Sequence, residues 1–466
     1  MPETDDLPLV EADLAVVGFG KGGKTLAAAL AKAGEQVVMI EQSDQMYGGT
    51  CINIGCVPTK ALVYQAEHPD RRQDPAQWYE QAIEKKSTLT ALLRSKNFAM
   101  LDTPETSTVI TGRATFTGPH TLLVTAGADQ LRVRAETIVV NTGSEPVLPP
   151  IPGLRESKYV VTSTGLLSRT PRPSELVILG GGFVGVEFAS MHAAFGTKVT
   201  LLHHGERLVH DEDTDVSAAV EELLIEAGVR VLTGVAVREV SDLEAAARVT
   251  YEGRDGTRSI VVGDVVLAAL GRRPATAGLG LERVGIAVDD RGAIVVDEYL
   301  RTSLPHVFAV GDVNGGPQFT YVSLDDYRIV LDQLTGEGKR STAGRVAVPA
   351  VTFMTPPLAR VGMTETQARA TGRPVKVATR KVADMATVPR ARIVGDPRGL
   401  MKAVVDAQTD AVLGATILAY DAHELINVIA LAMRHGITAT TLRDEIYTHP
   451  SMTEAFNDLF ANLTYA

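Results

Sequence analysis

Residues 13–41 read DLAVVGFGKGGKTLAAALAKAGEQVVMIE, and this stretch decides the fold. The apolar run at 13–17 predicts a buried strand, and the glycine-rich stretch 18–23 predicts a tight turn. Small and apolar residues at helical spacing follow, and a second apolar run at 37–40 ends at Glu41. This order predicts a βαβ unit that binds a nucleotide at the start of its helix.

The glycine turn satisfies two nucleotide-binding patterns. Gly18, Gly20 and Gly23 fit GxGxxG, whose glycines permit the turn and the close approach of the backbone to a pyrophosphate. With Lys24 and Thr25 the same letters also satisfy GxxxxGK[ST], the phosphate-binding P-loop. The turn alone therefore does not identify the nucleotide.

Glu41 favours the first pattern. It lies 23 positions after Gly18, directly after the second apolar run, where its carboxylate can accept hydrogen bonds from both ribose hydroxyls of a dinucleotide. A P-loop gains nothing from an acid at this place. We therefore expect a dinucleotide site, with Lys24 as a solvated helix residue.

The pattern returns over 175–204, ELVILGGGFVGVEFASMHAAFGTKVTLLHH, so two dinucleotide units lie in one chain. The expected contacts in the second turn are Gly180, Gly182, Val184 and Gly185. The residue at the ribose position is His203, followed by His204. Because an acid there would repel a 2′-phosphate, its absence makes NADPH acceptable, although no neighbouring arginine selects it. The alternative is that both histidines are exposed loop residues.

The remaining sequence indicates a third domain. A polar stretch at 68–77 precedes β-rich sequence, and a Pro/Gly cluster near residue 150 marks a boundary. Strand-like sequence at 293–300 and 306–312 leads to a helical stretch and a Gly/Arg-rich link at 336–345. Strand patterns and then helices follow, so we expect an α/β protein with two Rossmann-like domains and a C-terminal α+β domain.

Composition excludes several functional classes. The 466 residues suggest about three domains. A net charge of −11 and a pI near 5.5 argue against non-specific electrostatic binding to nucleic acid or anionic lipid. The acidic first thirteen residues do not resemble a signal peptide, and no apolar run is long enough to span a membrane. We expect a cytoplasmic protein whose partners are small molecules or a second copy of itself.

The chain has only two cysteines, Cys51 and Cys56, within GGTCINIGCVPTK at 48–60. A zinc site more often uses C-x₂-C spacing with two further ligands, and no other cysteine exists to complete one. Four intervening residues place the sulfurs about one helical turn apart, where they can close a disulfide beside a nucleotide-bound cofactor. This favours redox chemistry, and a metal site or coincidence are the alternatives.

A histidine and a carboxylate lie close together near the C-terminus, in THPSMTE at 448–454. A His-Pro pair is usually part of a loop. Beside thiol chemistry, His449 held by Glu454 can instead carry protons to and from a thiolate.

Together these residues resemble the class I pyridine nucleotide-disulfide oxidoreductases, the family of glutathione reductase, dihydrolipoamide dehydrogenase and mercuric reductase. The resemblance covers nearly the whole chain, and GGTCINIGCVPTK and THPSMTE are its most specific elements. It implies FAD binding by residues 1–155 and 291–344, NAD(P) binding by 156–290, and dimerisation through 345–466.

The resemblance also implies roles for single residues. Cys51 would be the interchange thiol that meets substrate, and Cys56 the charge-transfer thiol against the flavin. The other catalytic residues would be Lys60 and Glu187, an ion pair near the reactive flavin edge, and His449 and Glu454, an acid–base pair donated by the other subunit of a homodimer. FAD contacts would be Gly18, Gly20, Gly23, Glu41, Gly49, Thr50, Lys60, Ala114, Thr142, Gly143 and Asp312. NAD(P)H contacts would add Glu187, His203, His204 and Gly271 to those of the second turn.

Long strings such as GFGKGGKTLA and FTYVSLDDYRIV are similar to the reactive-chlorine-resistance subgroup, whose members are associated with reduction of hypothiocyanous acid. Pro357 departs from the glutamate of most of the wider family and fits the subgroup. The chain lacks the C-terminal cysteine pairs of mercuric reductases and large thioredoxin reductases, so electrons would leave from Cys51. A nearby helix N-terminus and a protonated His449 would lower the pKa of the Cys51 thiol.

Three alternatives remain open from the sequence. One is a low-molecular-weight disulfide reductase or dihydrolipoamide dehydrogenase, which would need a groove for a long substrate. Another is a reductase of copper(II) or mercury(II) using the same dithiol. The third is a flavin redox sensor without turnover, against which the presence of His449, Glu454, Lys60 and Glu187 together argues.

Overall fold

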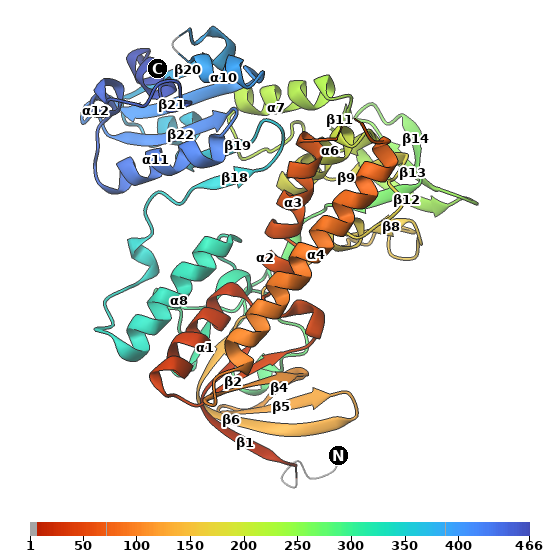
Figure 1. Cartoon of the computed structure of the whole chain (residues 1–466), viewed down its shortest axis with the longest axis vertical. Coiled ribbons are helices and arrows are strands. Elements are labelled where there is room, and N and C mark those ends of the chain that lie inside the picture. Colours follow the sequence, from red (N-terminus) through yellow and green to blue (C-terminus); the bar gives the residue numbers. More distant parts are fainter. Residues whose placement is uncertain (1–6, 71, 387) are drawn as a thin grey trace. The chain divides into compact units, whose positions relative to one another are not determined.

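A computed structural model describes residues 7–70, 72–386 and 388–466 (Figure 1). Residues 1–6, part of the acidic N-terminal stretch, lie outside the described residues. The chain forms two compact units. The first comprises the chain up to Ala61, Ala82–Val147 and Gly271–Gly344, and the second Leu62–Gln81, Leu148–Leu270 and Arg345–Ala466.

The first unit is built on a seven-stranded sheet in the order β3-β2-β1-β6-β5-β4, with β17 also paired to β6. β3 (Ser107–Thr111), β2 (Val37–Glu41), β1 (Leu9–Val17), β6 (Asp129–Val140) and β17 (Val307–Ala309) pair in parallel, and β4 (Arg113–Gly118) and β5 (Thr121–Ala126) extend the sheet in antiparallel fashion. Helices α1 (Lys21–Ala33) and α8 (Thr320–Thr335) pack against each other and belong to this unit. The predicted βαβ unit is therefore present as β1-α1-β2.

The second unit contains two larger sheets and a small one. A parallel sheet has the order β11-β10-β9-β15-β8: Arg230–Leu232, Lys198–Leu202, Glu175–Leu179, Val265–Ala268 and Val160–Val161. Its helices are α5 (Ser163–Leu166), α6 (Phe183–Ala194) and α7 (Thr214–Glu226), and a small antiparallel sheet joins β12 (Ala236–Asp242), β13 (Ala247–Glu252) and β14 (Arg258–Gly263). The second βαβ unit is β9-α6-β10.

The C-terminal part of the second unit is an antiparallel sheet in the order β18-β19-β22-β21-β20-β23. The strands are Ala350–Thr352, Leu358–Gly362, Val412–Leu418, Leu400–Asp406, Val375–Lys381 and Thr464–Tyr465. Helices α9 (Glu365–Ala370), α10 (Pro389–Ile393), α11 (Ala422–Arg434), α12 (Ala439–Asp444) and α13 (Ala455–Ala461) accompany it (Figure 1). This is the α+β arrangement that the strand-then-helix pattern predicted.

Strand β2 shows why the pattern predicted these elements well. All five of its residues are buried, as a strand covered on both faces requires, so its sequence is almost continuously apolar. In β9 and β10 the last four residues are buried, and the first residue of each is more accessible. The apolar runs of β1 and β9 end directly before the glycine turns that begin at Gly18 and Gly180.

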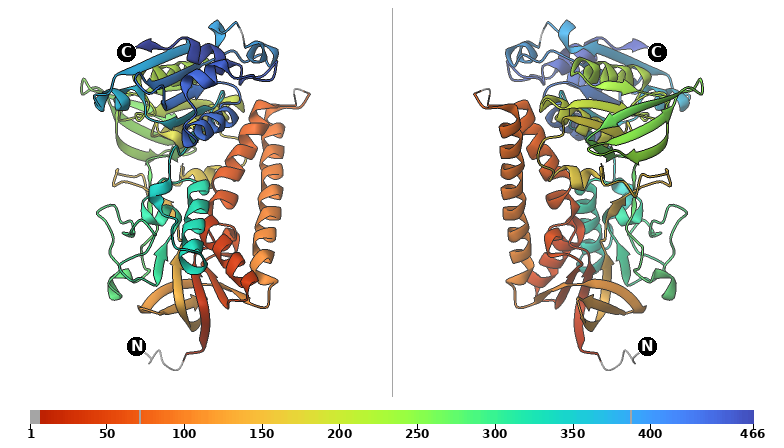
Figure 2. Two further views of the ribbon diagram at one scale, coloured as in Figure 1. Left: turned by 90° about the vertical axis from the view of Figure 1, so that its left-hand side faces the viewer. Right: turned by 90° about the vertical axis from the view of Figure 1, so that its right-hand side faces the viewer.

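The sequence analysis missed α4 (Pro75–Asp102), a 28-residue helix that follows α2 (Thr50–Asn53) and α3 (Cys56–Glu67). Figure 2 shows α3 and α4 side by side, and Trp78 Nε1 donates to Gln65 O at 3.0 Å between them. Lys86 and Thr90 are buried on α4 among its apolar residues, so the helical hydrophobic pattern is interrupted. Because α4 begins with polar residues and its apolar face is interrupted, its sequence lacks the periodic pattern from which a helix is predicted.

One strand expected from the sequence does not form. Residues 293–300 are not a strand, because only an isolated bridge between Val288 and Ile294 forms there. The strand-like stretch 306–312 does contain a strand, β17 at Val307–Ala309. Ile294 and Val296 pack against the cores of the first unit as irregular chain, and Val295 is 48% exposed.

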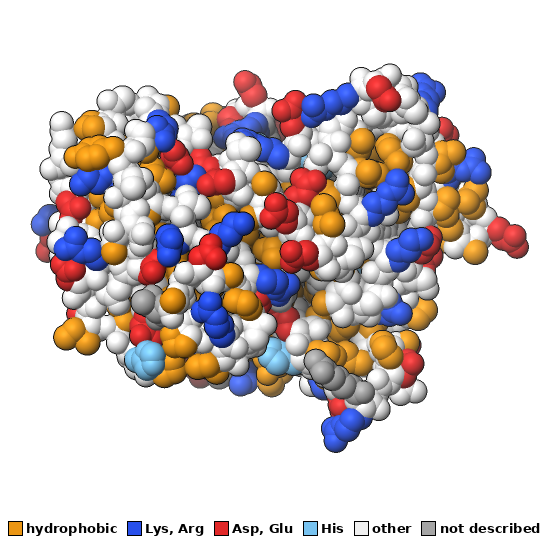
Figure 3. Space-filling view, turned by 90° about the horizontal axis from the view of Figure 1, so that it is seen from above, with side chains coloured by type: hydrophobic (Ala, Val, Ile, Leu, Met, Phe, Trp, Pro, Cys, Tyr) orange, Lys and Arg blue, Asp and Glu red, His pale blue; other side chains and the backbone are white. Residues whose placement is uncertain are grey.

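Surface charge agrees with the composition. Figure 3 shows acidic and basic side chains interspersed over the face in view, without an extended region of one sign. Among the described residues, no helix combines the length and apolar character that crossing a membrane requires.

Candidate active site

The first glycine turn is shaped by contacts that exclude side chains. Gly18 has φ +98°, and a Cβ there would meet the Asn141 carbonyl. The Asn141 side chain accepts a hydrogen bond from Gly23 N–H at 2.9 Å and donates to Val310 O at 2.7 Å. It thus joins the turn to the ends of β6 and β17. Asn141 was not singled out from the sequence, although a polar residue ending a buried strand is the signal that marked Glu41.

Glu41 closes the turn from the other side. Its Oε2 accepts from Phe19 N–H at 2.9 Å, and its Oε1 accepts from Ser43 N–H at 3.3 Å. Burial raises the pKa of this carboxyl, and the backbone N–H groups oppose that rise. Each oxygen retains a lone pair, so the carboxylate can still accept hydrogen bonds from ribose hydroxyls.

Lys24 and Thr25 exclude the P-loop alternative. Thr25 Oγ1 donates to Lys21 O at 2.6 Å, and Lys24 Nζ donates to Gly48 O at 3.1 Å and to Asn97 Oδ1. The two side chains that a P-loop turns toward phosphate and Mg²⁺ are thus bound to protein. The expectation of a solvated Lys24 is wrong: only 4% of the residue is exposed, because α4 and the loop before α2 cover it.

The other expected flavin contacts lie at the same edge of the first unit. Thr142 Oγ1 donates to Ala275 O at 2.8 Å, and Gly143 has φ +71° with Thr50 Oγ1 4.0 Å from a Cβ built on it. Gly49 has φ +77°, and a Cβ there would meet the Gly20 backbone. Ala114 is buried in the core, so only its backbone can face a ligand. These close backbone approaches are those a dinucleotide cradle needs, so the residues fit FAD.

Asp312 is oriented by two residues that the sequence analysis did not identify as site residues. Ser144 Oγ donates to Asp312 Oδ2 at 2.7 Å, and Arg272 Nε donates to Ser144 Oγ at 2.9 Å. Arg272 lies in β16 (Arg272–Pro274), which pairs with β7 (Ser144–Pro146). Gly271, just before β16, has φ +108° and open space where a Cβ would lie.

The two cysteines lie on different helices. Cys51 is in the short α2, the chain breaks helical geometry at Ile54 and Gly55, and Cys56 is the first residue of α3. They are thus not one turn apart on a single helix, as the spacing suggested. The structure holds them as free thiols, with Cys51 half-buried and Cys56 exposed. Each thiol shifts the pKa of the other, so the two sulfurs lie close enough to interact.

The charge of this pair resides on Cys56. The hydrogen bond from the Cys51 thiol lowers the pKa of Cys56 to about 6; burial opposes this, and the Thr320 hydroxyl and the Lys60 charge assist it. The Cys56 and Thr320 side chains are 3.5 Å apart, Sγ to Oγ1. The same hydrogen bond raises the pKa of Cys51. The expectation of a low pKa for Cys51 is therefore wrong for the dithiol, since Cys56 takes the longer helix N-terminus.

The second glycine turn has the same backbone contact as the first, but His203 accepts the hydrogen bond that Glu41 accepts in the first turn. Gly181 N–H donates to His203 Nδ1 at 3.1 Å, as Phe19 N–H does to Glu41. His203 is buried, and this burial, with the charges of His204 and His210, lowers its pKa. The ring is therefore neutral, and the exposed-loop alternative is wrong for His203, although His204 is exposed.

The rest of the second turn has room for a ligand. Gly182 precedes α6 and has open space where a Cβ would lie. A Cβ at Gly180 would meet Ala269 O, and one at Gly185 would meet the Gly180 carbonyl, so helix and strand pack tightly. Val184 is 37% exposed. These features fit a second dinucleotide at the N-terminus of α6.

His449 and Glu454 form the expected pair. His449 Nδ1 donates to Glu454 Oε1 at 2.8 Å, and Ser451 N–H donates to Oε2 at 2.9 Å. Burial raises the pKa of Glu454, but these hydrogen bonds outweigh it and the net shift is downward. The ionised carboxylate holds the imidazole through Nδ1, and the His449 side chain is 68% exposed. This is the geometry of an oriented proton carrier.

Glu187 and Lys60 belong to different compact units. Glu187 is buried in α6, and its Oε1 accepts from Phe353 N–H at 2.8 Å. Lys60 lies in α3, one turn after Cys56. Their ion pair stays a prediction.

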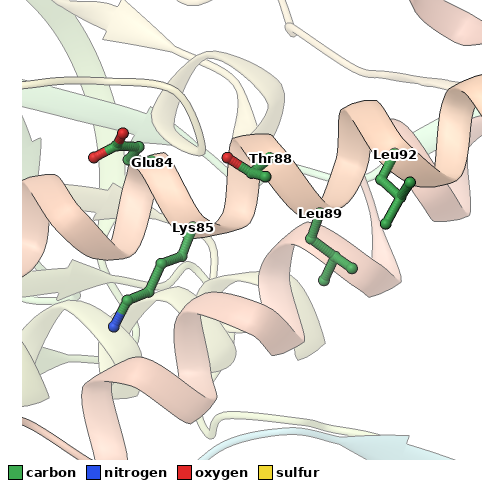
Figure 4. Close-up of a pocket in the computed structure, with 5 residues that line it drawn as sticks. All are labelled: Glu84, Lys85, Thr88, Leu89 and Leu92. Atoms are coloured by element: carbon green, nitrogen blue, oxygen red, sulfur yellow. The ribbon is translucent and has the colours of Figure 1, made fainter.

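One surface depression does not contribute to this site. Figure 4 shows it on α4, lined by Glu84, Lys85, Thr88, Leu89 and Leu92. All five side chains come from one helix, and none is a predicted site residue. A shallow hollow of this kind does not mark the redox centre.

Comparison with known proteins now defines the family. The family model described as pyridine nucleotide-disulphide oxidoreductase matches residues 12–326, and the model of its dimerisation domain matches 348–460. The chain belongs to this family. As a member, it is an oxidoreductase that uses FAD and a nicotinamide nucleotide.

Similar proteins span the family's activities. The probable pyridine nucleotide-disulfide oxidoreductase RclA of Escherichia coli K12 is 48% identical, over 96% of this chain and 98% of its own. A mercuric reductase of Streptomyces lividans is 36% identical, over 95% and 94%, and a dihydrolipoyl dehydrogenase of Geobacillus stearothermophilus 32%, over 96% and 94%. A structure of the HOCl-induced flavoprotein disulfide reductase RclA as a Cu(II) complex has a TM-score of 0.91 at 47% identity, covering 97% of this chain and 99% of that one.

Proposed function

We propose that this flavoprotein reduces hypothiocyanous acid to thiocyanate, in oxidative-stress defence, with electrons from NAD(P)H that pass through the Cys51–Cys56 pair. In this proposal residues 1–155 and 291–344 bind FAD, 156–290 bind NAD(P)H and 345–466 join two subunits. The observation that carries it is the thiol pair itself: Cys51 and Cys56 interact, Cys56 Sγ lies 3.5 Å from Thr320 Oγ1, and the pKa of Cys56 is lowered to about 6.

When bound, FAD would supply the two-electron chemistry that links NAD(P)H to the Cys51–Cys56 disulfide. Glu41 would hold a ribose, and Asp312, oriented by Ser144, would hold the flavin side chain. Gly182 would let the nicotinamide nucleotide approach the start of α6.

The Cys56 thiolate, stabilised by the Lys60 charge and the Thr320 hydroxyl, would remain against the flavin. Because the pKa of Cys51 is raised in the dithiol, this thiol needs a base. His449, oriented by Glu454 and donated by the other subunit, would take that proton through Nε2.

The substrate steps balance as two displacements at sulfur. The Cys51 thiolate attacks the sulfur of hypothiocyanous acid, forming a Cys51–S–SCN bond and releasing hydroxide, which the histidinium proton converts to water. The Cys56 thiolate then attacks Cys51 sulfur, closing the disulfide and releasing thiocyanate. The oxidant gains the two electrons that the dithiol loses.

NAD(P)H oxidation by the purified flavoprotein tests the proposal, with hypothiocyanous acid, glutathione disulfide, lipoamide, copper(II) and mercury(II) compared at matched concentrations. Preferential turnover of hypothiocyanous acid, lost in Cys51→Ser, supports it. Preference for a disulfide or a metal ion identifies one of those reductases and rejects the substrate. Stoichiometric flavin reduction without turnover of any oxidant identifies a redox sensor.

A further inference from the structure

Lys24 is a buried cation that the mechanism above does not use. It lies in the first turn of α1 with 4% of its surface exposed. Its Nζ donates to the Gly48 carbonyl at 3.1 Å and to Asn97 Oδ1. Burying an ammonium group costs free energy unless an interaction offsets it, so this placement calls for an explanation.

Both hydrogen-bond partners lead to the redox loop. Gly48 and Gly49 have φ of +97° and +77°, and Gly49 is the N-cap of α2, which carries Cys51. Asn97 lies on α4 and is itself held, because its Nδ2 donates to Leu93 O at 2.7 Å. Lys24 therefore joins α1 and α4 to the backbone three residues before Cys51.

α4 holds the other end of α2 as well. Arg94 Nε donates to Asn53 Oδ1 at 2.9 Å, and Asn53 is the last residue of α2. The short helix is thus fixed at its start by Lys24 and Asn97 and at its end by Arg94. A four-residue helix has little stability of its own, so these contacts decide where Cys51 lies.

Charge links Lys24 to Cys51 directly. Burial and the neighbouring Lys21 lower the pKa of Lys24 to about 8, and the Cys51 thiolate opposes them. Reciprocally, the Lys24 charge lowers the pKa of Cys51 against the larger effects of Cys56 and burial. The charged groups that act on Lys24 are thus Lys21 on its own helix and Cys51 on α2.

We propose that Lys24 is a positioning residue for the reactive thiol: its ammonium group fixes the Gly48 carbonyl ahead of α2 and stabilises the Cys51 thiolate electrostatically. This inference rests on the proposed role of Cys51 as the thiol that meets substrate. It explains how a thiol disfavoured as an anion by Cys56 and by burial becomes available for attack.

The two-cysteine content permits a clean test. In the flavin-loaded Cys56→Ser protein, Cys51 is the sole thiol, so its alkylation by iodoacetamide can be followed by mass spectrometry across pH. In this background, Lys24→Met removes charge and hydrogen bonds, Lys24→Gln keeps a donor for Gly48 without charge, and Lys24→Arg keeps both. Lys32→Met, at the exposed end of α1, controls for net charge.

Lys24→Met and Lys24→Gln should each raise the pKa of the Cys51 thiol, slowing alkylation near neutral pH about tenfold, the effect of one pKa unit. Lys24→Arg and Lys32→Met should leave the profile within about twofold of the parent. In the parent, deprotonation of Lys24 above about pH 8 removes the stabilising charge, so its profile should be broader than that of Lys24→Met.

The electrostatic role is overturned if the alkylation rate of Cys51 depends on pH in the same way in the parent, Lys24→Met and Lys24→Gln. A shift in Lys24→Met alone would overturn it too and leave only the Gly48 hydrogen bond. If Lys24→Met loses its flavin, the comparison of Lys24→Gln with Lys24→Arg tests the electrostatic role, because these two variants differ in the charge at position 24. The alkylation rate does not depend on the oxidant, so failure of hypothiocyanous acid as substrate leaves this test intact.

Discussion

At the scale of single residues, equivalent positions perform the same backbone role with different chemistry. Glu41 and His203 both accept a hydrogen bond from the second residue of a glycine turn. The carboxylate keeps capacity for two ribose hydroxyls, whereas the neutral imidazole has given its acceptor nitrogen to Gly181. His203 thus removes a negative charge without adding a positive one.

This predicts a change in coenzyme preference. His203→Glu should retain the bond from Gly181 N–H but place a carboxylate where the 2′-phosphate of NADPH would lie. The ratio of kcat/KM for NADPH to that for NADH should fall about tenfold or more, because opposing like charges costs more than about 1.4 kcal/mol. His203→Gln, a neutral acceptor, is the control and should leave the ratio nearly unchanged. Equal ratios in all three proteins would show that residue 203 does not discriminate.

The two thiols should differ in colour when substituted. Cys51→Ser leaves the Cys56 thiolate, which should give a long-wavelength charge-transfer band against oxidised FAD; Cys56→Ser should lack the band. Both variants should lose turnover. Since the pKa of Cys56 is about 6 with Cys51 as donor, the band of the two-electron-reduced parent should fade as pH falls through about 6. Absorbance spectra check this, and a band in Cys56→Ser alone would reverse the assignment.

At the scale of elements, buried charges join the Rossmann-like part of the second unit to the C-terminal sheet. Lys402 of β21 is 4% exposed, and its Nζ lies 3.1 Å from Asp213, 3.0 Å from Asp215 and 2.8 Å from Glu365. Asp213 also accepts from Thr366 N–H at the start of α9. One cation is therefore shared by three carboxylates, two from the start of α7 and one from α9.

Lys402→Met should therefore destabilise the protein strongly. We expect a loss of about 3 kcal/mol in the free energy of unfolding, the low end for breaking a buried ion pair, because Asp215 is partly solvated. Lys198→Met, which removes an exposed pair with Glu175, should cost less than about 1 kcal/mol. Denaturant unfolding followed by circular dichroism measures both, and similar midpoints for the two variants would contradict the prediction.

The same cluster predicts acid sensitivity. Burial raises the pKa of Asp213, but hydrogen bonds from Thr366, Glu365 N–H and Lys402 lower it more, to about 2 from an ordinary 3.8. A depressed folded pKa stabilises the protein above the unfolded value, so this contribution is complete above about pH 4 and is lost toward pH 2. Lys402→Met should weaken this acid-dependent loss. Thermal melting between pH 5 and pH 2 measures it.

At the scale of the whole molecule, the proposed mechanism takes Cys51 and His449 from different chains of a dimer. His449 and Glu454 lie in the part matched by the dimerisation-domain model, and Cys51 lies in the other compact unit. His449→Ala should reduce turnover about 10²–10⁴-fold while leaving flavin content and flavin reduction by NAD(P)H intact. The loss should be smaller for hypothiocyanous acid, a strong electrophile, than for an ordinary disulfide.

Subunit mixing distinguishes a site shared between chains from one within a chain. Each heterodimer of His449→Ala and Cys51→Ser subunits retains one complete shared site, with Cys51 from one chain and His449 from the other. Its activity should approach half of the parent value per dimer. Absence of recovery, with subunit exchange demonstrated by mass spectrometry, would place both residues in one chain.

The two βαβ units, the closely spaced cysteines and the histidine held by a carboxylate could all be predicted from the sequence. Each depends on residues close in sequence: apolar strands end at glycine turns, Glu41 follows one strand, and Glu454 is five residues from His449. Local geometry decides such features, so a pattern of residue types is sufficient to find them. Helix α4 was not predicted from the sequence because Lys86 and Thr90 interrupt the apolar pattern of its buried face.

Only the tertiary structure decided which groups carry charge and what surrounds them. Lys24 looked like a solvated helix residue until Asn97, 73 positions away, covered it. Cys56 rather than Cys51 became the favoured thiolate because the Cys51 thiol lowers its pKa, assisted by the Thr320 hydroxyl and the Lys60 charge. Solvation and hydrogen bonding set a pKa, and both depend on neighbours brought from distant parts of the chain, which spacing along the sequence does not encode.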